Sequence, residues 1–553
     1  MHGLLHDIGI AIIAATIIGI ITHAIKQPII VGYLIAGIII GPEIGQKLIT
    51  NVENIELISE IGLVLLLFVI GLELDLKAIL KSGKQILILG VGQFFICVIF
   101  GLLVFYFVGY SFSTKNQEVL YLSLLCALSS TAIVVKSLND KFEIETLTGR
   151  TSVGVLIIQD LWAIMLLAFQ PNFNNPEFLV IGISLLKSVI LIALGFLISK
   201  HILKKIFKSV SKSPELVISI SLGWCAFMAG LADFMGLSKE MGALIAGLSI
   251  SVFPYSIHVT AKTLPLRDSF LILFFVSLGM KIIAPEYGII KQSLLVVFFI
   301  VISRFASIIP LVLMSGGGLR TGFITSLNIA QLSEFSLVVA SIGVVLGHIK
   351  PELFSMLIYA MAFSAIISSY FIKYNHELFR LFEKFLKLIK LRKQTSLMLV
   401  ETLETTQHSI VLLGCHRGAM SFLHHIAEKQ PEFLPQILVV DFNLETIKEL
   451  KRMKVSAVFG DISQLDTLTH LNIDKTKIII STIPDVLLKG INNASLVKMC
   501  RLVAPEVTIV ATADMPSQIE ELRKMGANEV LLPYSMAGEY LASYIKGLFA
   551  KEY

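Results

Sequence analysis

The sequence predicts a polytopic α-helical membrane protein of about 13 transmembrane helices, followed by a smaller α/β domain. Of its 553 residues only 15% are charged, against about 25% in soluble proteins, and 55% are hydrophobic. The mean hydropathy is +0.82. Apolar runs of about 20 residues, each long enough to cross a hydrocarbon core of about 30 Å, recur from Ile8 to Tyr374. This composition excludes a soluble globular protein.

Charged residues, prolines and glycines divide the apolar part into about thirteen spans. They cover residues 8–25, 28–46, 56–74, 85–110, 119–137, 150–170, 178–200, 215–233, 238–253, 266–283, 291–314, 321–347 and 352–374. The odd connections hold about fifteen Lys and Arg and the even ones about six, which predicts that the odd connections and the C-terminal part face the cytoplasm. We expect a multi-pass protein of the inner (plasma) membrane. The net charge of +5 reflects this topology, and no nucleic-acid partner is expected.

Two short motifs occur twice in the apolar part. GYLIAG at 32–37 recurs as GALIAG at 242–247, and FVIG at 68–71 recurs as FVSLG at 275–279. Both copies lie seven spans apart, and an odd separation turns the second copy upside down in the bilayer. The pattern predicts two inverted six-helix repeats joined by span seven, although glycine-rich apolar hexamers also match by chance.

The chain changes character after the last span, so we divide it into a transmembrane domain at 1–375, a linker at 376–406 and a final domain at 407–553. Residues 376–393 form a cationic amphipathic helix, suited either to anionic membrane lipid or to packing on a neighbouring domain. The final domain contains six short β-rich runs separated by helical stretches. They cover residues 409–414, 436–440, 456–460, 477–481, 507–511 and 529–532. This alternation predicts a parallel, doubly wound, Rossmann-like sheet.

An acid lies in the middle of span six. Asp160 is ten residues from both Arg150 and Gln170, about 15 Å from each end of the span. A carboxylate at that depth is costly and is read as functional by default, with a structural ion pair as the alternative. We predict a functional role for Gln159 because it is adjacent to Asp160. An isolated amide in a membrane span often only holds helices together.

Arg304 also falls near the middle of its span, thirteen residues from Lys291 and eleven from Ser315. Arginine stays protonated and cannot carry a transported proton. We expect it to pair with Asp160 when no cation is bound, or else to extend toward lipid headgroups.

Two spans are interrupted by polar residues at matched places in the two repeats. Span five contains Ser129, Ser130 and Thr131, and span twelve contains a polar run from Asn328 to Glu334. Helices unwind at such places and offer carbonyls and helix ends to an ion, although small hydroxyls also pack helices. Glu334 is expected to balance helix ends or Lys136, and is not assigned to the ion site.

The final domain opens with a strand and a glycine turn, GCHRGA at 414–419. A dinucleotide fingerprint GxGxxG would have glycines where His416 and Ala419 stand, which puts close approach of a pyrophosphate in doubt. Asp441 ends the second strand and can accept hydrogen bonds from ribose hydroxyls. The alternative is a vestigial domain that only dimerises. The predicted nucleotide-binding residues are Gly414, His416, Arg417, Asp441 and Asp461.

These motifs together resemble the monovalent cation:proton antiporter-2 family, in its Kef-type glutathione-regulated potassium efflux branch with a C-terminal RCK/KTN (TrkA-N) domain. The resemblance is carried by PIIVGYLIAG at 28–37, FVIGLE at 68–73, SSTA at 129–132, the Gln159–Asp160 pair, FVSLGM at 275–280 and QLSEF at 331–335. Phe459-Gly460-Asp461 resembles the Gly-Asp signature of the regulatory domains. Gln159 before the aspartate is similar to the Kef type.

The resemblance implies exchange of potassium for protons by a homodimer in which a core domain moves past a dimerisation domain. Ion binding is then expected at Asp160, Gln159, Ser129, Ser130, Thr131 and Arg304, with Asp160 and Gln159 as potassium ligands. Arg304, where relatives commonly have lysine, favours electroneutral exchange. An adenine nucleotide is expected on the final domain, AMP rather than NAD(H). Glutathione or its adducts are possible further partners, but no residue can be assigned to them.

A single midplane carboxylate holds either a proton or a monovalent cation, because Coulomb repulsion opposes both at once. Competition at Asp160 would then couple the two fluxes in a one-for-one exchange. The alternatives are a sodium:proton antiporter of the same fold and, less favoured, a nucleotide-gated cation channel, which should show a filter such as TVGYG. An enzyme is disfavoured by the altered glycines.

Overall fold

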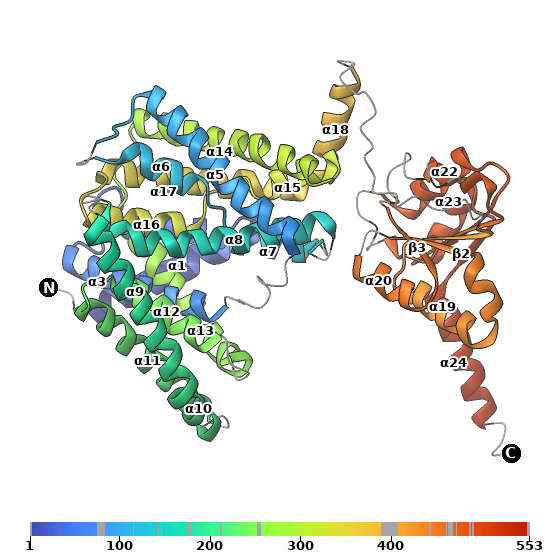
Figure 1. Cartoon of the computed structure of the whole chain (residues 1–553), viewed down its shortest axis with the longest axis horizontal. Helices are drawn as coiled ribbons and strands as arrows, with labels where there is room; N and C mark the ends of the chain where they lie inside the picture. Colours follow the sequence, from blue (N-terminus) through green and yellow to red (C-terminus); the bar gives the residue numbers. More distant parts are fainter. Residues whose placement is uncertain are drawn as a thin grey trace. The chain divides into compact units, whose positions relative to one another are not determined.

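The computed structural model describes most of the chain. The described residues are 3–73, 83–113, 116–141, 143–144, 146–173, 178–210, 213–251, 256–388, 408–441, 444–460, 462, 468–469, 471, 473–485, 488 and 491–549. They form two compact units. The first contains Met1–Leu138, Thr151–Ser315 and Leu319–Asn375, and the second contains Asn139–Arg150, Gly316–Gly318 and His376–Tyr553. Most of the first unit is helical, and the second contains the β-sheet (Figure 1).

The membrane unit is a bundle of apolar helices. Its elements are α1 (Leu4–Ala24), α2 (Ile29–Ile40), α3 (Val52–Glu73), α5 (Gly83–Val108), α6 (Glu118–Cys126), α7 (Thr131–Asp140), α8 (Leu147–Phe169), α9 (Phe178–Ile198), α10 (Lys204–Val210), α11 (Pro214–Phe234), α12 (Lys239–Ser251), α13 (Ser256–Met280), α14 (Tyr287–Met314), α15 (Leu319–Asn328), α16 (Glu334–Val345) and α17 (Pro351–Lys373). Nine spans are long and apolar enough to cross a membrane, with α6 and α7 counted together. The shorter α2 and α12, the apolar part of α13 at Ser269–Met280 and the interrupted pair α15–α16 complete the thirteen predicted spans in the described part of the chain.

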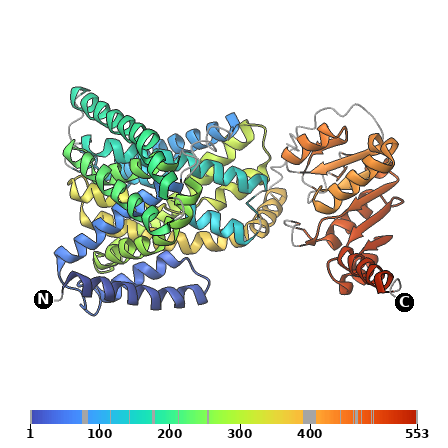
Figure 2. The same ribbon diagram turned by 90° about the horizontal axis from the view of Figure 1, so that it is seen from below.

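The helices pack in two groups that mix the repeats. In the first group, α2 and α3 from the first repeat pack on α12 and α13 from the second. In the second group, α5 packs on α14, and α6 packs on α16. The helix α1, drawn dark blue, lies at the edge of the bundle, and only 22% of its apolar window is buried (Figure 2). This exchange of equivalent partners is what two inverted repeats produce.

The repeated glycines make the closest contacts in the first group. A Cβ on Gly37 of α2 would lie 2.8 Å from Cα of Gly279 in α13. A Cβ on Gly247 of α12 would lie 2.9 Å from Cα of Gly71 in α3. Each contact pairs one motif copy with the other motif, so the predicted sequence repeat is also a symmetric packing contact. Small residues allow helix backbones to approach this closely in membranes.

Both predicted polar interruptions are true breaks in the helices. The span at 118–140 stops at Cys126 and restarts at Thr131, and the span at 319–345 stops at Asn328 and restarts at Glu334. The breaks are deeply buried, since Ser129, Ser130 and Gln331 are all 0% exposed. Irregular backbone at membrane depth is tolerated only where protein or a cavity surrounds it.

The second unit contains a six-stranded parallel sheet in the order β3-β2-β1-β4-β5-β6. Its strands are β1 (Ile410–Leu413), β2 (Ile437–Asp441), β3 (Ser456–Phe459), β4 (Ile478–Ser481), β5 (Thr508–Thr512) and β6 (Glu529–Leu531). Its helices are α18 (Asn375–Leu388, of which Asn375 belongs to the first unit), α19 (Arg417–Lys429), α20 (Leu444–Arg452), α22 (Asn493–Val503), α23 (Ile519–Lys524) and α24 (Pro533–Phe549). The strand order is that of a Rossmann fold, which confirms the prediction.

Alternate residues of β1 face opposite sides of this sheet. Leu412 packs with Ala419 and Leu423 of α19, whereas Val411 and Leu413 pack in the cluster that includes Val497 of α22. Helices therefore cover both faces, and the strands carry almost uninterrupted apolar residues as buried parallel strands do. The carboxyl ends of the strands remain for a ligand. The predicted linker is helical from Asn375 to Leu388, and its remainder at 389–406 lies outside the described residues.

Candidate ion and nucleotide sites

Asp160 lies in the middle of α8, where only 8% of it is exposed. The hydroxyl Oγ1 of Thr131 donates a hydrogen bond of 3.0 Å to its Oδ2. Because Thr131 is the first residue of α7, the carboxylate is held at a helix N-terminus, where the helix dipole favours negative charge. The structure thus brings together the predicted acid and one predicted hydroxyl, from two consecutive helices.

Gln159 points into the helix crossing. Its Oε1 accepts from the backbone N–H of Ser129 at 2.8 Å, and its Nε2 donates to Oε1 of Gln93 at 2.7 Å. Both polar atoms are therefore used to fix the break before α7. These contacts position the backbone at the break, and the predicted role of Gln159 as a potassium ligand stays a prediction.

The two broken helices are braced against each other. Oγ of Ser129 donates to the carbonyl of Ile329 at 2.8 Å, and Nε2 of Gln331 donates to the carbonyl of Ser130 at 3.2 Å. Oγ of Ser336 donates to the carbonyl of Leu125 at 2.8 Å. Each break supplies hydrogen-bond partners to the other, so unwound backbone at this depth stays satisfied.

Arg304 is fully buried, and its guanidinium donates hydrogen bonds at the C-terminal ends of α6 and α15. Its Nε donates to the carbonyl of Ile329 at 3.1 Å, and its Nη2 donates to the carbonyls of Cys126 and Leu128 at 2.7 and 3.2 Å. Its Nη1 donates to Sγ of Cys97 at 3.2 Å. These carbonyls end α6 and α15, where the helix dipole is negative.

This arrangement corrects both expectations for Arg304. Among the described residues its hydrogen bonds go to carbonyls and a sulfur, and no ion pair with Asp160 is formed. Its burial also excludes extension toward headgroups. A planar guanidinium with a fork of donors suits several carbonyls at once, which a lysine does not.

Glu334 is an acid that was not predicted to belong to the ion site. It is the first residue of α16, it is 8% exposed, and Ser333 caps the helix by accepting from the N–H of Phe335. Its Oε2 is buried without a hydrogen-bond partner, and Gln331, three residues before it, contacts the carbonyl of Ser130, the residue before Thr131. Its position directly after the second break was the available signal.

A third acid lies at the end of α3. Glu73, in the motif at 68–73, forms an ion pair of 2.7 Å with Arg267 of α13, and both side chains are about one third exposed. Its charge acts on both Asp160 and Glu334. The described residues contain no group of three or more His, Cys, Asp or Glu side chains suited to a resident metal. Two carboxylates with hydroxyls fit a monovalent ion as substrate.

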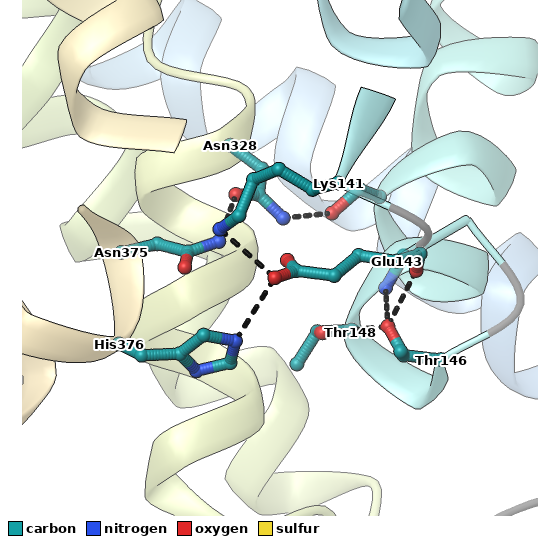
Figure 3. Close-up of polar contacts among 9 residues, drawn as sticks. Lys141, Glu143, Thr146, Thr148, Asn328, Asn375 and His376 are labelled. Atoms are coloured by element: carbon teal, nitrogen blue, oxygen red, sulfur yellow. Dashed lines mark hydrogen bonds and ion pairs between the residues drawn. The ribbon is translucent and has the colours of Figure 1, made fainter. Parts of the chain in front are cut away.

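A separate buried acid lies in the loop before α8 (Figure 3). The Glu143 side chain is 2% exposed. Its Oε1 lies 2.9 Å from Nζ of Lys141 and 3.2 Å from Nε2 of His376. Burial by itself raises the pKa of this carboxyl, but the hydrogen bond from His376 and the charge of Lys141 outweigh it and lower the pKa from 4.5 to about 2. This cluster was not predicted, because His376 lies 233 residues from Glu143 in the chain.

The nucleotide turn is preorganised at the carboxyl end of β1. Gly414 has a φ of +80°, which favours glycine, and its N–H donates to the carbonyl of Val440 at 2.7 Å. The N–H of Cys415 donates to Oδ2 of Asp441 at 2.6 Å. His416 and Arg417 are exposed at the start of α19. Asp461 lies outside the described residues.

An unpartnered hydroxyl indicates that this edge suits a polar ligand. Oγ1 of Thr482, directly after β4, is buried without a hydrogen-bond partner. A Cβ on Gly418 would lie 3.3 Å from the same threonine, so the glycine keeps this space open. With Asp441 and the N-terminus of α19, these residues fit the ribose and a phosphate of a nucleotide.

Comparisons with known proteins identify the chain. The family model "Sodium/hydrogen exchanger, transmembrane" matches residues 11–374, and the "TrkA-N domain" model matches residues 410–533. The chain therefore belongs to the sodium/hydrogen exchanger family and carries a C-terminal TrkA-N domain. It is a multi-pass inner-membrane protein, as predicted.

Individual relatives place it in the Kef-type branch that the motifs resemble. It is 26% identical to the putative cation/proton antiporter YbaL of Escherichia coli over 94% of this chain and 93% of that protein. It is 26% identical to the glutathione-regulated potassium-efflux system protein KefC of Escherichia coli over 90% of this chain and 78% of that one. The solved sodium proton antiporter MjNhaP1 of Methanocaldococcus jannaschii, at 17% identity, has the same fold over 67% of this chain and 96% of its own, with a TM-score of 0.50.

Proposed function

We propose that this protein exchanges potassium for protons across the membrane by competition at Asp160. The observation that carries the proposal is a carboxylate at the middle of α8, buried to 8% exposure and held by Thr131 at the N-terminus of α7. Such a site favours one positive charge and disfavours two, so a proton and a cation replace each other. Potassium is favoured because relatives such as KefC bear potassium efflux in their names.

Exchange is proposed to be one-for-one and electroneutral. Arg304 keeps its charge at the ends of α6 and α15, so it neither leaves nor joins the ion site during the cycle. Alternating access follows if the group containing α5–α8 and α14–α17 moves against the group containing α2, α3, α12 and α13. Sodium is the second candidate, supported by the shared fold of MjNhaP1.

The test is ion-driven pH change in proteoliposomes. Potassium, sodium or rubidium is added outside, with a membrane-potential clamp to detect net charge movement. Asp160→Asn is expected to abolish exchange, whereas Asp233→Asn, which neutralises an exposed acid at the end of α11, should leave it unchanged. Exchange that persists in Asp160→Asn would overturn the proposal, and a preference for sodium would replace potassium as substrate.

The second unit is proposed to bind an adenine nucleotide, with AMP favoured over NAD(H), through Gly414, His416, Arg417 and Asp441. His416 and Ala419 replace two fingerprint glycines, which leaves less backbone room for a pyrophosphate than for one phosphate. Thermal unfolding of the full chain in detergent should show stabilisation by AMP that Asp441→Asn reduces. Stabilisation by NADH and not by AMP would favour the dinucleotide. Glutathione is added in the same experiment to test whether it also stabilises the protein.

Regulation is proposed to reach the ion site through the loop at 139–150. This loop leads directly into α8, which carries Asp160, and its Glu143 binds His376 at the beginning of α18. A movement of α18 therefore acts on the chain segment that precedes the transport helix.

The homodimer is proposed to involve α24. Every described side chain of this helix is exposed, including Tyr540 at 71%, Tyr544 at 56% and Leu548 at 51%. An isolated helix of 17 residues is marginal in water, so most of its stability must come from packing. A second copy of the chain would supply that packing. Removing the apolar face with Tyr540→Ser and Leu548→Ser should shift the detergent-purified protein toward monomer.

A further inference from the structure

Glu334 has an oxygen that the protein leaves without a partner. Its Oε2 is buried and makes no hydrogen bond. A buried carboxylate oxygen without a donor costs about 1–3 kcal/mol or more unless a ligand fills its place. The side chain is 8% exposed, so bulk water does not supply that partner freely.

The unpartnered oxygen belongs to a residue beside the helix break that holds Asp160. Thr131, whose hydroxyl holds Asp160, follows Ser130, and the Ser130 carbonyl accepts from Nε2 of Gln331, three residues before Glu334. Asp160 thus lies at the N-terminus of α7, and Glu334 is the first residue of α16, the helix that restarts at the facing break. Two helix N-termini favour negative charge here, and the Glu334 charge acts directly on Asp160.

Among the residues that the structure describes, no basic side chain forms an ion pair with Asp160 or Glu334. Arg304 is engaged at the opposite ends, on the last carbonyls of α6 and α15. Besides Asp160, the charged group that acts on Glu334 is Glu73, which is another acid and is paired with Arg267. Two carboxylates in one dry site cannot both stay charged, so the pair requires a proton or a cation.

We propose that Glu334 is a second acidic ligand of the transported ion, so that Asp160 and Glu334 together hold either one monovalent cation or one shared proton. This rests on the exchange proposed above and adds to it a residue that sets the apparent cation affinity. In both loaded states the pair and its ligand carry the same net charge. A two-carboxylate site therefore keeps one-for-one exchange electroneutral without a participating lysine.

The experiment measures exchange as a function of potassium concentration and pH in proteoliposomes. Glu334→Gln keeps the size of the side chain but removes one charge from the site. It should raise the KM for potassium about tenfold, because a lost Coulomb interaction of about 1.4 kcal/mol corresponds to that factor. The pH of half-maximal exchange should fall, since Asp160 then loses its proton without a neighbouring negative charge. Glu352→Gln, at the exposed start of α17, makes the same charge change as a control and should alter neither quantity.

A second measurement separates a ligand role from a structural one. Potassium should stabilise the detergent-purified wild type against heat, and Glu334→Gln should lose most of that potassium-dependent shift while keeping its stability in potassium-free buffer. Should Glu334→Gln not fold, Glu334→Asp retains the charge on a shorter arm and should still raise the KM. An unchanged KM and pH profile in the folded variant would overturn the assignment of Glu334. Failure of the exchange proposal is distinct, since it would appear as activity in Asp160→Asn.

Discussion

The two broken helices, α6–α7 and α15–α16, are equivalent elements of the two repeats, but their charged partners differ. The helix that begins at Thr131 has no acid in its first turn, and its Thr131 hydroxyl binds Asp160 of α8. The helix that begins at Glu334 has an acid as its first residue. Arg304 of the second repeat donates hydrogen bonds to carbonyls at both C-terminal ends, at Cys126 in α6 and directly after Asn328 in α15. Symmetric backbone thus creates two positive and two negative helix ends, and asymmetric side chains decide which ends bind an ion.

A second contrast separates the two helix groups. The group around the breaks is held by buried hydroxyls, amides and a guanidinium, while the group of α2, α3, α12 and α13 is held by glycine contacts between backbones. Polar bracing compensates unwound backbone, and glycine packing fixes continuous helices. The following variants test these assignments.

The largest effect is expected from Arg304→Met. It leaves the buried carbonyls of Cys126 and Leu128 without a donor, at about 1–3 kcal/mol each, and the carbonyl of Ile329 with only Ser129, so the thermal midpoint in detergent should fall steeply and exchange should be lost. Arg304→Lys keeps the charge but not the fork of donors, and should lose most of the same stability. Arg523→Lys, exposed on α23, is the matched control. Wild-type stability and exchange in Arg304→Lys would show that Arg304 acts as a point charge, as the sequence reasoning expected.

A smaller loss is expected from Gly247→Ala. The added methyl would collide with the carbonyl of Phe68 and lie 2.8 Å from the N of Leu72, so α12 and α3 must separate. Overpacking of this kind costs about 1–3 kcal/mol. Gly230→Ala in α11, where nothing lies within 4 Å, should be neutral or stabilising by up to about 1 kcal/mol. Equal thermal midpoints for the two variants would contradict the glycine contact.

An effect of similar size is expected at Glu143, and it depends on pH. Its folded-state pKa of about 2 lies below the ordinary 4.5, so its stabilisation is complete above pH 4.5 and is lost as pH falls toward 2. At 1.36 kcal/mol per pKa unit this amounts to about 3 kcal/mol. Glu143→Gln should be less stable than wild type at pH 7, and the gap should narrow below pH 4.5. Thermal unfolding at several pH values measures it, with Glu428→Gln on α19 as control. A gap that does not change with pH would exclude the ionised pair.

Much of the fold follows from local patterns in the sequence. Spans such as α8 and α14 are apolar for the full width of a bilayer, and the polar runs near Ser129 and Gln331 mark the breaks because unwound backbone needs such residues. The Rossmann order was predictable from six apolar strands alternating with helices, since parallel strands require crossovers.

The sequence by itself therefore determined the membrane spans, the repeat, the sheet and the position of Asp160 half-way along its span, because hydrophobic length and periodicity are local properties of the chain. Only the tertiary structure decided that Arg304 donates to carbonyls, that Gln159 accepts from the backbone of Ser129, and that Glu334 begins α16 with a buried, unpartnered oxygen. The same holds for Glu143 and His376. The direction of a polar side chain depends on which unsatisfied groups remote segments bring within hydrogen-bonding distance, and that is fixed only when the helices pack.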